Sequence, residues 1–315
     1  MDSSELQKLA QHTRFMREAG FALLIASGFL AVLLFVPFGT REAPVATETV
    51  TASTTPDAFA AIPLEAQAAI VYDLTTGETL YEKNSDAQLP LASLTKLLTV
   101  YAALAELSPH TPITISTQAT QVEAPRAFNV GQVFSLSDLA RLTLTASLND
   151  GAAAIIEAAA ARQNRTANEA LASAAAALDL AQTYALNGNG LDASTVVSGG
   201  YGSARDMARL AGALVSVAPD IAAATTENTT QAVSAGGTSF TVKNTDPMTQ
   251  TIPRLLLSKT GYTSLAGGNL ALVFDAGIGH PIAVVVLGSS QKARFTDGAV
   301  LVNATLAHFA GVASL

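Results

Sequence analysis

The sequence of 315 residues contains no cysteine and no tryptophan, and aromatic residues make up only 6% of it. Without cysteine there can be no disulfide, no thiolate metal site and no cysteine nucleophile. Charged residues are also scarce, at 13%, and 17 Lys and Arg against 25 Asp and Glu give a net charge of −8. An acidic balance without a long basic run argues against nucleic acid as a partner.

Hydrophobic residues are abundant, at 49%, and the mean hydropathy of +0.35 is high for a soluble protein. Residues 19–40 contain no charged side chain, and a helix of that length spans about 33 Å, enough to cross a hydrocarbon core. Lys8, Arg14 and Arg17 precede this segment and only Arg41 follows it closely. The basic residues therefore predict a single-pass protein of the cell membrane, with a cytoplasmic N-terminus and an extracytoplasmic bulk.

Two other interpretations of the apolar segment are a cleaved signal peptide and a buried core helix. No small-x-small cleavage site directly follows the apolar residues, and no amphipathic pattern interrupts them. An uncleaved anchor is therefore preferred. The predicted organisation is a cytoplasmic tail at 1–18, a transmembrane anchor at 19–40, a Thr-, Ala- and Pro-rich stalk at 41–60, and one domain at 61–315.

Within the domain, short apolar segments at both ends enclose a helical middle. A strand is predicted at 68–73, with a returning strand at 78–82, and two alanine-dense helical segments at 152–161 and 170–177 indicate a helical lobe. The spacings Ser135 to Asp138, Thr166 to Glu169 and Ser203 to Asp206 each predict a helix start. Further strands and a last helix are predicted at 240–243, 255–259, 269–274, 281–288 and 297–309. Strands at both ends predict one sheet that the returning chain completes.

The first candidate for chemistry is Ser93-Leu94-Thr95-Lys96, at the start of a predicted helix. Residues three apart share a helix face, so the Lys96 amine can reach the Ser93 hydroxyl. A lysine whose pKa is lowered by burial or by other cations can activate a serine nucleophile. By itself this pattern is common, and an exposed pair on an amphipathic helix is the simpler interpretation.

Two more short segments carry suitable groups. In Ser147-Leu148-Asn149, Ser147 could relay a proton and Asn149 could hold a substrate amide or Lys96. Asn149 and Gly151 are, however, also typical of a helix end. In Lys259-Thr260-Gly261, Lys259 and Thr260 could bind a carboxylate, and Gly261 would let an extended ligand lie along the strand edge. The three motifs occur together and in the order found in serine enzymes that react with penicillin.

With these motifs, the domain resembles the D-alanyl-D-alanine carboxypeptidases, the low-molecular-mass penicillin-binding proteins. The resemblance implies a β-lactamase/transpeptidase-like α/β (α+β) fold, with an antiparallel sheet flanked by helices and a helical lobe. It extends over residues 62–310. Besides the motifs, similar segments lie at 68–84, 90–99, 187–192, 203–206 and 259–270, and Arg294 falls where the family places an arginine near the substrate carboxylate.

The resemblance implies an acyl-enzyme mechanism on peptidoglycan stem peptides that end in D-Ala-D-Ala. Ser93 would attack with Lys96 as base, and Ser147 would pass a proton to the leaving amine. The backbone N–H groups of Ser93 and Tyr262 would form the oxyanion hole. Penicillins and other β-lactams would acylate Ser93. No metal or cofactor is expected.

Several alternatives stay open or are disfavoured. The motifs do not separate a carboxypeptidase from a D,D-endopeptidase. A class A β-lactamase would have Asp where Leu148 stands, and a Glu that directs the deacylating water, for which Glu157 and Glu169 are the candidates. Compared with the carboxypeptidase family, Leu148 is bulkier than the Gly or Ala usual at that position. A non-catalytic peptidoglycan-binding protein would be expected to lack Ser93, Lys96 or Lys259. A Ser-His-Asp hydrolase is disfavoured by the positions of the four histidines.

Overall fold

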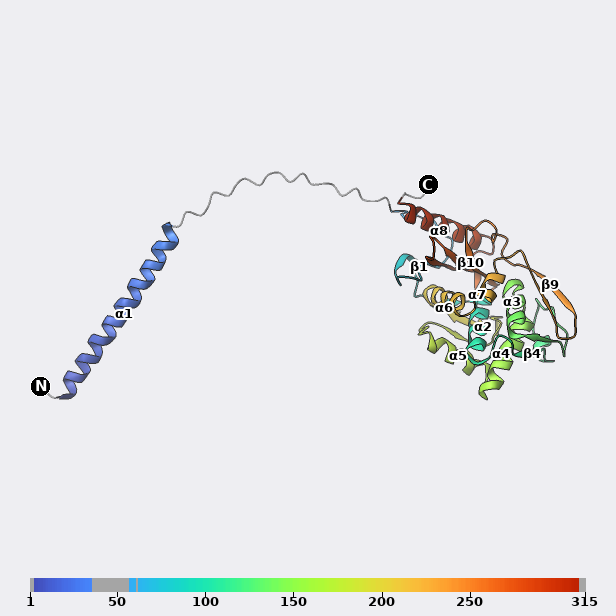
Figure 1. Ribbon diagram of the computed structural model, residues 1–315, viewed down its shortest axis with the longest axis horizontal. Helices are drawn as coiled ribbons and strands as arrows, with labels where there is room; N and C mark the ends of the chain where they lie inside the picture. Colours follow the sequence, from blue (N-terminus) through green and yellow to red (C-terminus); the bar gives the residue numbers. More distant parts are fainter. Residues whose placement is uncertain (1–2, 36–56, 61, 312–315) are drawn as a thin grey trace. The chain divides into compact units, whose positions relative to one another are not determined.

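The protein was analysed as a computed structural model that describes residues 3–35, 57–60 and 62–311 (Figure 1). The chain divides into two units, residues 1–53 and 54–315, and each is described by itself. In the first unit, helix α1 runs over Ser3–Phe35. All other helices and strands belong to the second unit.

The predicted membrane anchor at 19–40 is corrected by the structure. Among the described residues, no helix has both the length and the apolar character that a membrane crossing requires. Helix α1 is described from Ser3, so charged residues of the predicted tail 1–18 belong to the same helix as residues 19–35. Positions 36–40 and most of the predicted stalk, 41–56, lie outside the described residues. The prediction of a single-pass cell-membrane protein is therefore wrong.

The second unit is built on a five-stranded antiparallel sheet with the strand order β10-β11-β12-β1-β2. The first and last strands of the unit meet in its middle, where Ile70 pairs with Val285. This confirms that the returning chain completes one sheet. The strands are β1 (Ala68–Asp73), β2 (Thr79–Lys83), β10 (Leu255–Thr263), β11 (Gly267–Asp275) and β12 (Pro281–Ser289).

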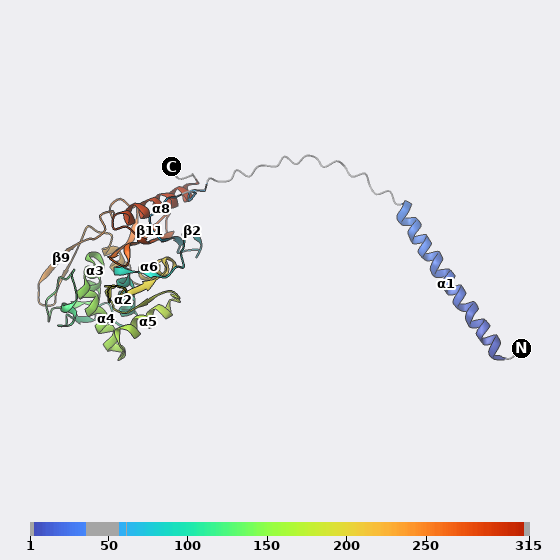
Figure 2. The same ribbon diagram turned by 180° about the vertical axis from the view of Figure 1, so that it is seen from behind.

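Both faces of this sheet are buried, because a helix covers each (Figures 1 and 2). Ile70 faces the side covered by helix α6 (Ala204–Val217), whereas its neighbours Ala69 and Val71 face the side covered by helix α8 (Ala293–Ala310). Successive strand residues point to opposite faces. A strand buried on both sides therefore reads as a continuous apolar run, as the sequence of 68–73 does.

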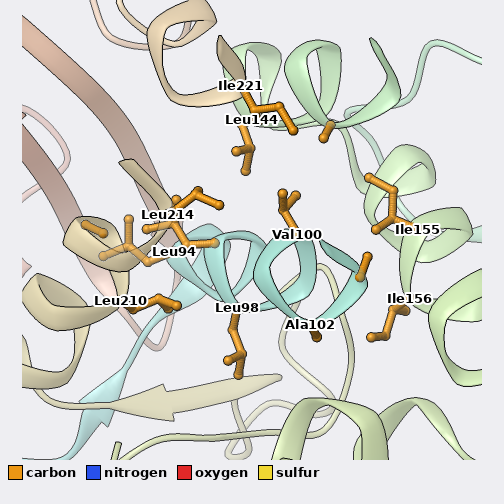
Figure 3. Packing of buried hydrophobic residues seen from close by; sticks show 14 of the residues in the cluster. Leu94, Leu98, Val100, Ala102, Leu144, Ile155, Ile156, Leu210, Leu214 and Ile221 are labelled. Atoms are coloured by element: carbon orange, nitrogen blue, oxygen red, sulfur yellow. The ribbon is translucent and has the colours of Figure 1, made fainter. Parts of the chain in front are cut away.

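Helix α2 (Thr95–Glu106) lies at the centre of the helical lobe and is buried on nearly all sides. Figure 3 shows Leu94, Leu98 and Val100 among side chains of the surrounding helices. Burying one such leucine stabilises the fold by about 1.5–3 kcal/mol, so the position of the helix start is well determined. The surrounding helices are α3 (Leu136–Ala146), α4 (Asn149–Gln163), α5 (Ala167–Ala177), α6 and α7 (Pro219–Ala224).

Short elements connect the lobe to the sheet. The strands β3 (Leu89–Pro90), β7 (Gly200–Gly202) and β6 (Tyr184–Ala185) form one small sheet. Two hairpin-like pairs are β4 (Pro112–Thr114) with β5 (Val133–Ser135), and β8 (Thr229–Val233) with β9 (Ser239–Lys243). The 3-10 turns are η1 (Ala92–Leu94) and η2 (Ala119–Gln121).

The predicted helix starts are confirmed at their caps. Ser135 and Ser203 each accept a hydrogen bond from the backbone N–H three residues on, and Thr166 with Glu169 forms a complete capping box. The second motif differs from expectation. Helix α3 ends at Ala146, and Asn149 begins α4 instead of ending the preceding helix.

Candidate active site

The Ser93 hydroxyl is positioned by the 3-10 turn η1, which leads directly into α2. The residue before it, Ala92, is fully buried and has a left-handed backbone with φ of 48°, a conformation that is costly for a residue with a Cβ atom. Gly190 packs against this turn, and any side chain there would collide with the Ala92 carbonyl. The turn is therefore held by its surroundings, with Ser93 at its middle.

Lys96 lies one helical turn after Ser93, and its Nζ is 2.7 Å from the Ser93 Oγ. The same amine donates to the Asn189 carbonyl at 2.7 Å. Asn187 fixes that loop, because its Oδ1 accepts from Gly190 N at 2.7 Å and its Nδ2 donates to the Leu191 carbonyl at 3.0 Å. The predicted Ser93–Lys96 contact is thus present, whereas the role of the Asn189 carbonyl was not foreseen.

Lys96 is completely buried. Its burial lowers the pKa of the amine well below the usual value, and the positive charge of Lys259 lowers it further, while the negative charge of Asp150 opposes both effects. Asp150 is itself fully buried, and its Oδ2 accepts from the backbone N–H groups of Ala127 and Phe128 at 2.8 Å each. A lysine in this setting is suited to be neutral and to accept a proton.

The Ser147 hydroxyl lies at the tight junction between α3 and α4. Ser147 caps α3 with a left-handed φ of 58°, and its Oγ accepts a hydrogen bond from Lys259 Nζ at 2.9 Å. Asn149 and Lys96 are not hydrogen-bonded to each other, since Lys96 donates to Ser93 and Asn189. Asn149 Nδ2 donates to the carbonyls of Glu123 and Ala124 at 3.0 Å each, and Asn149 Oδ1 is buried without a partner. The unpaired oxygen is available to accept a donor.

Lys259 and Thr260 lie on β10, the strand at the edge of the large sheet. Lys259 is 1% exposed, and burial together with the charge of Arg294 lowers its pKa to about 7, against an opposing effect of Asp246. Its Nζ also donates to the Thr260 carbonyl at 2.8 Å. The Thr260 hydroxyl lies 2.7 Å from that of Thr245.

Gly261 brings this strand directly against the Ser93 turn. A Cβ atom at Gly261 would lie 2.9 Å from the Leu91 carbonyl oxygen and 3.2 Å from Ser93 N, so only glycine permits the approach. Tyr262 follows with a half-exposed side chain. Arg294, from the start of α8, is 8% exposed and donates to the Gly261 carbonyl at 2.6 Å. The third motif therefore lies beside the first, as predicted.

The electrostatic balance around these groups is positive. Lys259 and Arg294 are buried basic side chains beside Lys96, and the nearby anions Asp150 and Asp246 are occupied by other hydrogen bonds. Asp246 accepts from Ser258 Oγ at 2.6 Å and from the Met248 N–H at 2.8 Å. Neither anion was foreseen, because an isolated Asp carries no signal of burial in the sequence. The arrangement favours an anionic substrate.

The glutamates that a class A β-lactamase would need, and a histidine that a Ser-His-Asp hydrolase could use, make hydrogen bonds to other residues. Glu157 accepts a hydrogen bond from Ser116 at 2.6 Å, and Glu169 caps α5, so neither candidate for a β-lactamase water site has the role it would need. His280 Nε2 lies 2.7 Å from Asp73 Oδ2 and joins the ends of β12 and β1. In the described part of the chain, no cluster of three His, Asp or Glu side chains is suited to a metal ion.

A buried lysine hydrogen-bonded to a serine on a left-handed turn, beside an edge strand with a second buried lysine, is the arrangement of a serine hydrolase. Comparison with known proteins gives the family. The family model for D-alanyl-D-alanine carboxypeptidases matches residues 51–291. The chain belongs to this family.

Curated relatives carry two different names. The chain is 29% identical to a D-alanyl-D-alanine endopeptidase of Pseudomonas aeruginosa, over 78% of this chain and 80% of that protein. It is also 29% identical to the D-alanyl-D-alanine carboxypeptidase DacC of Escherichia coli, over 74% of this chain and 59% of that protein.

Solved structures share the fold of the second unit. The D-alanyl-D-alanine carboxypeptidase DacD of Francisella tularensis superposes with a TM-score of 0.68 at 23% identity, covering 77% of this chain and 70% of that one. A penicillin-binding protein of Listeria monocytogenes, solved in its ampicillin-bound form, superposes with a TM-score of 0.65 at 26% identity. The match covers 78% of this chain and 98% of that one. The predicted fold class, an antiparallel sheet flanked by helices with a helical lobe, is confirmed.

Proposed function

We propose that the protein is a serine D,D-peptidase that removes the terminal D-Ala from peptidoglycan stem peptides, through an acyl-enzyme on Ser93. The observation that carries the proposal is the 2.7 Å contact between Ser93 Oγ and the Nζ of the fully buried Lys96. Membership of the D-alanyl-D-alanine carboxypeptidase family supports the same reaction. Residues 61–315 form the proposed catalytic domain.

In the acylation step, neutral Lys96 takes the proton of Ser93 while Oγ attacks the carbonyl carbon of the penultimate D-Ala. The oxyanion is stabilised by the backbone N–H groups of Ser93 and Tyr262. The C–N bond then breaks, and the proton that Lys96 took from Ser93 passes through Ser147 to the leaving amine, so that Lys96 is neutral again. The Ser147 hydroxyl is positioned by its hydrogen bond from Lys259.

Recognition of the terminal carboxylate is assigned to the cationic side of β10. Lys259 supplies charge, the Thr260 hydroxyl donates a hydrogen bond, and Arg294 contributes a second cation beside Gly261. Asn149 holds the acyl side of the peptide, because its buried Oδ1 lacks a partner and can accept the substrate N–H.

In the deacylation step, water attacks the Ser93 ester with Lys96 as base, and the shortened peptide leaves with Ser93 regenerated. No metal or cofactor takes part in either step. A β-lactam presents a strained amide beside a carboxylate, so it acylates Ser93 in the same way. The ampicillin-bound relative supports this inference.

The test is an assay of free D-Ala after incubation of the full chain with a peptide that ends in D-Ala-D-Ala. We expect release by the wild type, none from a matched L-Ala-L-Ala peptide, and none by Ser93→Ala. A fluorescent penicillin should label the wild type and not the variant. The absence of both D-Ala release and penicillin labelling in the wild type would refute the proposal. Fast penicillin turnover without D-Ala release would assign the protein as a β-lactamase.

A further inference from the structure

The small sheet that leads into the turn η1 has an aromatic outer face. Its strand order is β3-β7-β6, and Tyr201 of the middle strand pairs with Pro90 on one side and with Tyr184 on the other. Residues paired across strands lie on the same face of a sheet, so these three side chains share one face. The opposite face carries Ala185 and Gly200, which are buried. The face with the two tyrosines is therefore the outer one.

The two tyrosine rings of this face are stacked, with centroids 5.1 Å apart and planes 18° from parallel. The Tyr201 hydroxyl accepts a hydrogen bond from Ser198 N at 2.9 Å, which fixes that ring. Tyr184 lies on β6, at the edge of the sheet, and is 43% exposed. Because Tyr201 covers one side of the Tyr184 ring, the exposed area belongs to its other side and its rim. A ring held in this way is a preformed surface for an apolar ligand face.

The segment that carries this face is polar but almost without charge. Between positions 181 and 203 the only acidic or basic side chain is Asp192, and it accepts a hydrogen bond from Thr263 Oγ1 at 3.0 Å. Two amide side chains lie at one end of the sheet, where Gln88 Nε2 donates to the Gln182 carbonyl at 2.8 Å. An anionic ligand would find no cation on this segment to pair with. A neutral ligand with an apolar face and a rim of hydroxyl and amide groups fits it better.

The small sheet is also bonded to the segments that carry the candidate catalytic groups. The Gly200 carbonyl of β7 accepts a hydrogen bond from Leu91 N at 2.9 Å, two residues before Ser93. The segment between β6 and β7 carries the Asn189 carbonyl, which accepts from Lys96 at 2.7 Å. A polymer bound to the outer face would therefore be held close to the candidate active site.

We propose that the outer face of this sheet binds a neutral saccharide, the glycan strand to which the stem peptide is attached. The sugar rings of that strand have an apolar C–H face, which would stack on the open side of Tyr184. Their hydroxyl and N-acetyl groups would meet the amides of Gln88 and Gln182. This inference rests on the proposed function and extends it from the peptide to the polymer that carries it. The reaction at Ser93 is unchanged, so the contact should act on substrate binding alone.

The first test uses the full-length wild type and one stem peptide that ends in D-Ala-D-Ala, either free or linked to an N-acetylated disaccharide. We expect KM to be about fivefold lower for the linked substrate, with kcat unchanged, since one ring contact contributes a modest free energy. In Tyr184→Ala the two KM values should become equal, whereas Tyr184→Phe, which keeps the ring, should keep the difference. Equal KM values in the wild type, or a difference that survives Tyr184→Ala, would overturn the inference.

The matched control is Phe309→Ala, which removes an aromatic side chain of similar exposure, 41%, near the end of α8. This variant should keep the wild-type difference in KM. Labelling by a fluorescent penicillin checks in each variant that the candidate active site is intact. A dimer in solution that Tyr184→Ala dissociates would assign the face to a second copy of the chain and overturn the inference.

The second test measures binding of an N-acetylglucosamine oligomer to the full chain by NMR, without any reaction. We expect the ring signals of Tyr184 and Tyr201 to shift in the wild type and in Ser93→Ala, and no binding by Tyr184→Ala. No binding by the wild type would overturn the inference and leave the proposed function intact if D-Ala is still released. Saccharide binding without D-Ala release or penicillin labelling would refute the proposed function and leave the saccharide site standing.

Discussion

Two serine–lysine pairs lie in the candidate active site, and they differ in how their lysines are surrounded. Ser93 is bonded to Lys96 at 2.7 Å within the lobe, and Ser147 to Lys259 at 2.9 Å between the lobe and the sheet. Both lysines are buried, and both serines lie at turns with a left-handed residue. The same pair of residue types is therefore used twice, in two settings.

The difference lies in the neighbours. Lys96 has the Asn189 carbonyl as its second acceptor and a single hydroxyl to activate. Lys259 has Arg294 nearby and lies on an edge strand that can meet a ligand. We interpret Lys96 as the base for Ser93, and Lys259 as a cation that serves both Ser147 and the substrate carboxylate.

The largest effect is expected from removing either lysine. Lys96→Gln should lower kcat/KM by about 10³-fold or more for every substrate, because no base remains for Ser93. Lys259→Gln should lower it by about 10²-fold, mainly through KM, because a carboxylate partner is lost. Steady-state kinetics on D-Ala-D-Ala peptides measures both, and circular dichroism checks folding. Equal kcat losses in the two variants would contradict the division of roles.

A smaller loss is expected when the second serine is changed. Ser147→Ala should lower kcat by about 10²-fold through poorer protonation of the leaving amine, while labelling by penicillin, whose amine stays tethered, falls less. Ser147→Gly removes the hydroxyl without straining the backbone, since glycine tolerates the left-handed conformation of this residue. Wild-type rates in Ser147→Gly would show that the hydroxyl has no part in the reaction.

The pH dependence of kcat/KM tests the assigned role of Lys259 without any mutation. The pKa of Lys259 is about 7, so the amine is charged below that pH and neutral above it. The ratio of kcat/KM for a carboxylate substrate to that for its carboxamide should therefore fall as pH rises through about 7. The ratio cancels effects common to both substrates, including those of Lys96. A ratio independent of pH between 5 and 9 would contradict the assignment of Lys259 to the carboxylate.

The smallest effect is expected from removing the Thr245 hydroxyl, which contacts the Thr260 hydroxyl. Thr245→Val removes the 2.7 Å hydroxyl contact while keeping the side-chain shape, and it should raise KM about fivefold, equivalent to about 1 kcal/mol, with kcat little changed. Thr241→Val, on the exposed side of β9, is the matched control. An equal KM for Thr245→Val and the control would show that Thr260 needs no such support.

The sequence predicted the sheet and the motifs because both depend on local patterns. The continuous apolar run in 68–73 and the spacing of Ser93 and Lys96 are visible within a few residues. Longer-range features were not predictable. The Asn189 carbonyl reaches Lys96 only after the loop is folded, and Asn149 begins a helix because a left-handed Ser147 ends the previous one.

The predicted membrane anchor was wrong for a related reason. Hydropathy identified an apolar stretch, but it did not show that the helix containing it begins at Ser3 and includes the charged residues before residue 19. The strand at Thr229–Val233 was missed as well, because its alternation is between threonine or glutamine and small residues.

The central claim is that Ser93, activated by Lys96, forms the covalent intermediate. The most direct test is mass spectrometry of the full chain after brief exposure to ampicillin, followed by digestion to locate the adduct. The account predicts one ampicillin per chain on the peptide that contains Ser93, no adduct in Ser93→Ala, and a much slower adduct in Lys96→Gln. An adduct on Ser147 or on either lysine, or one that persists in Ser93→Ala, would contradict it.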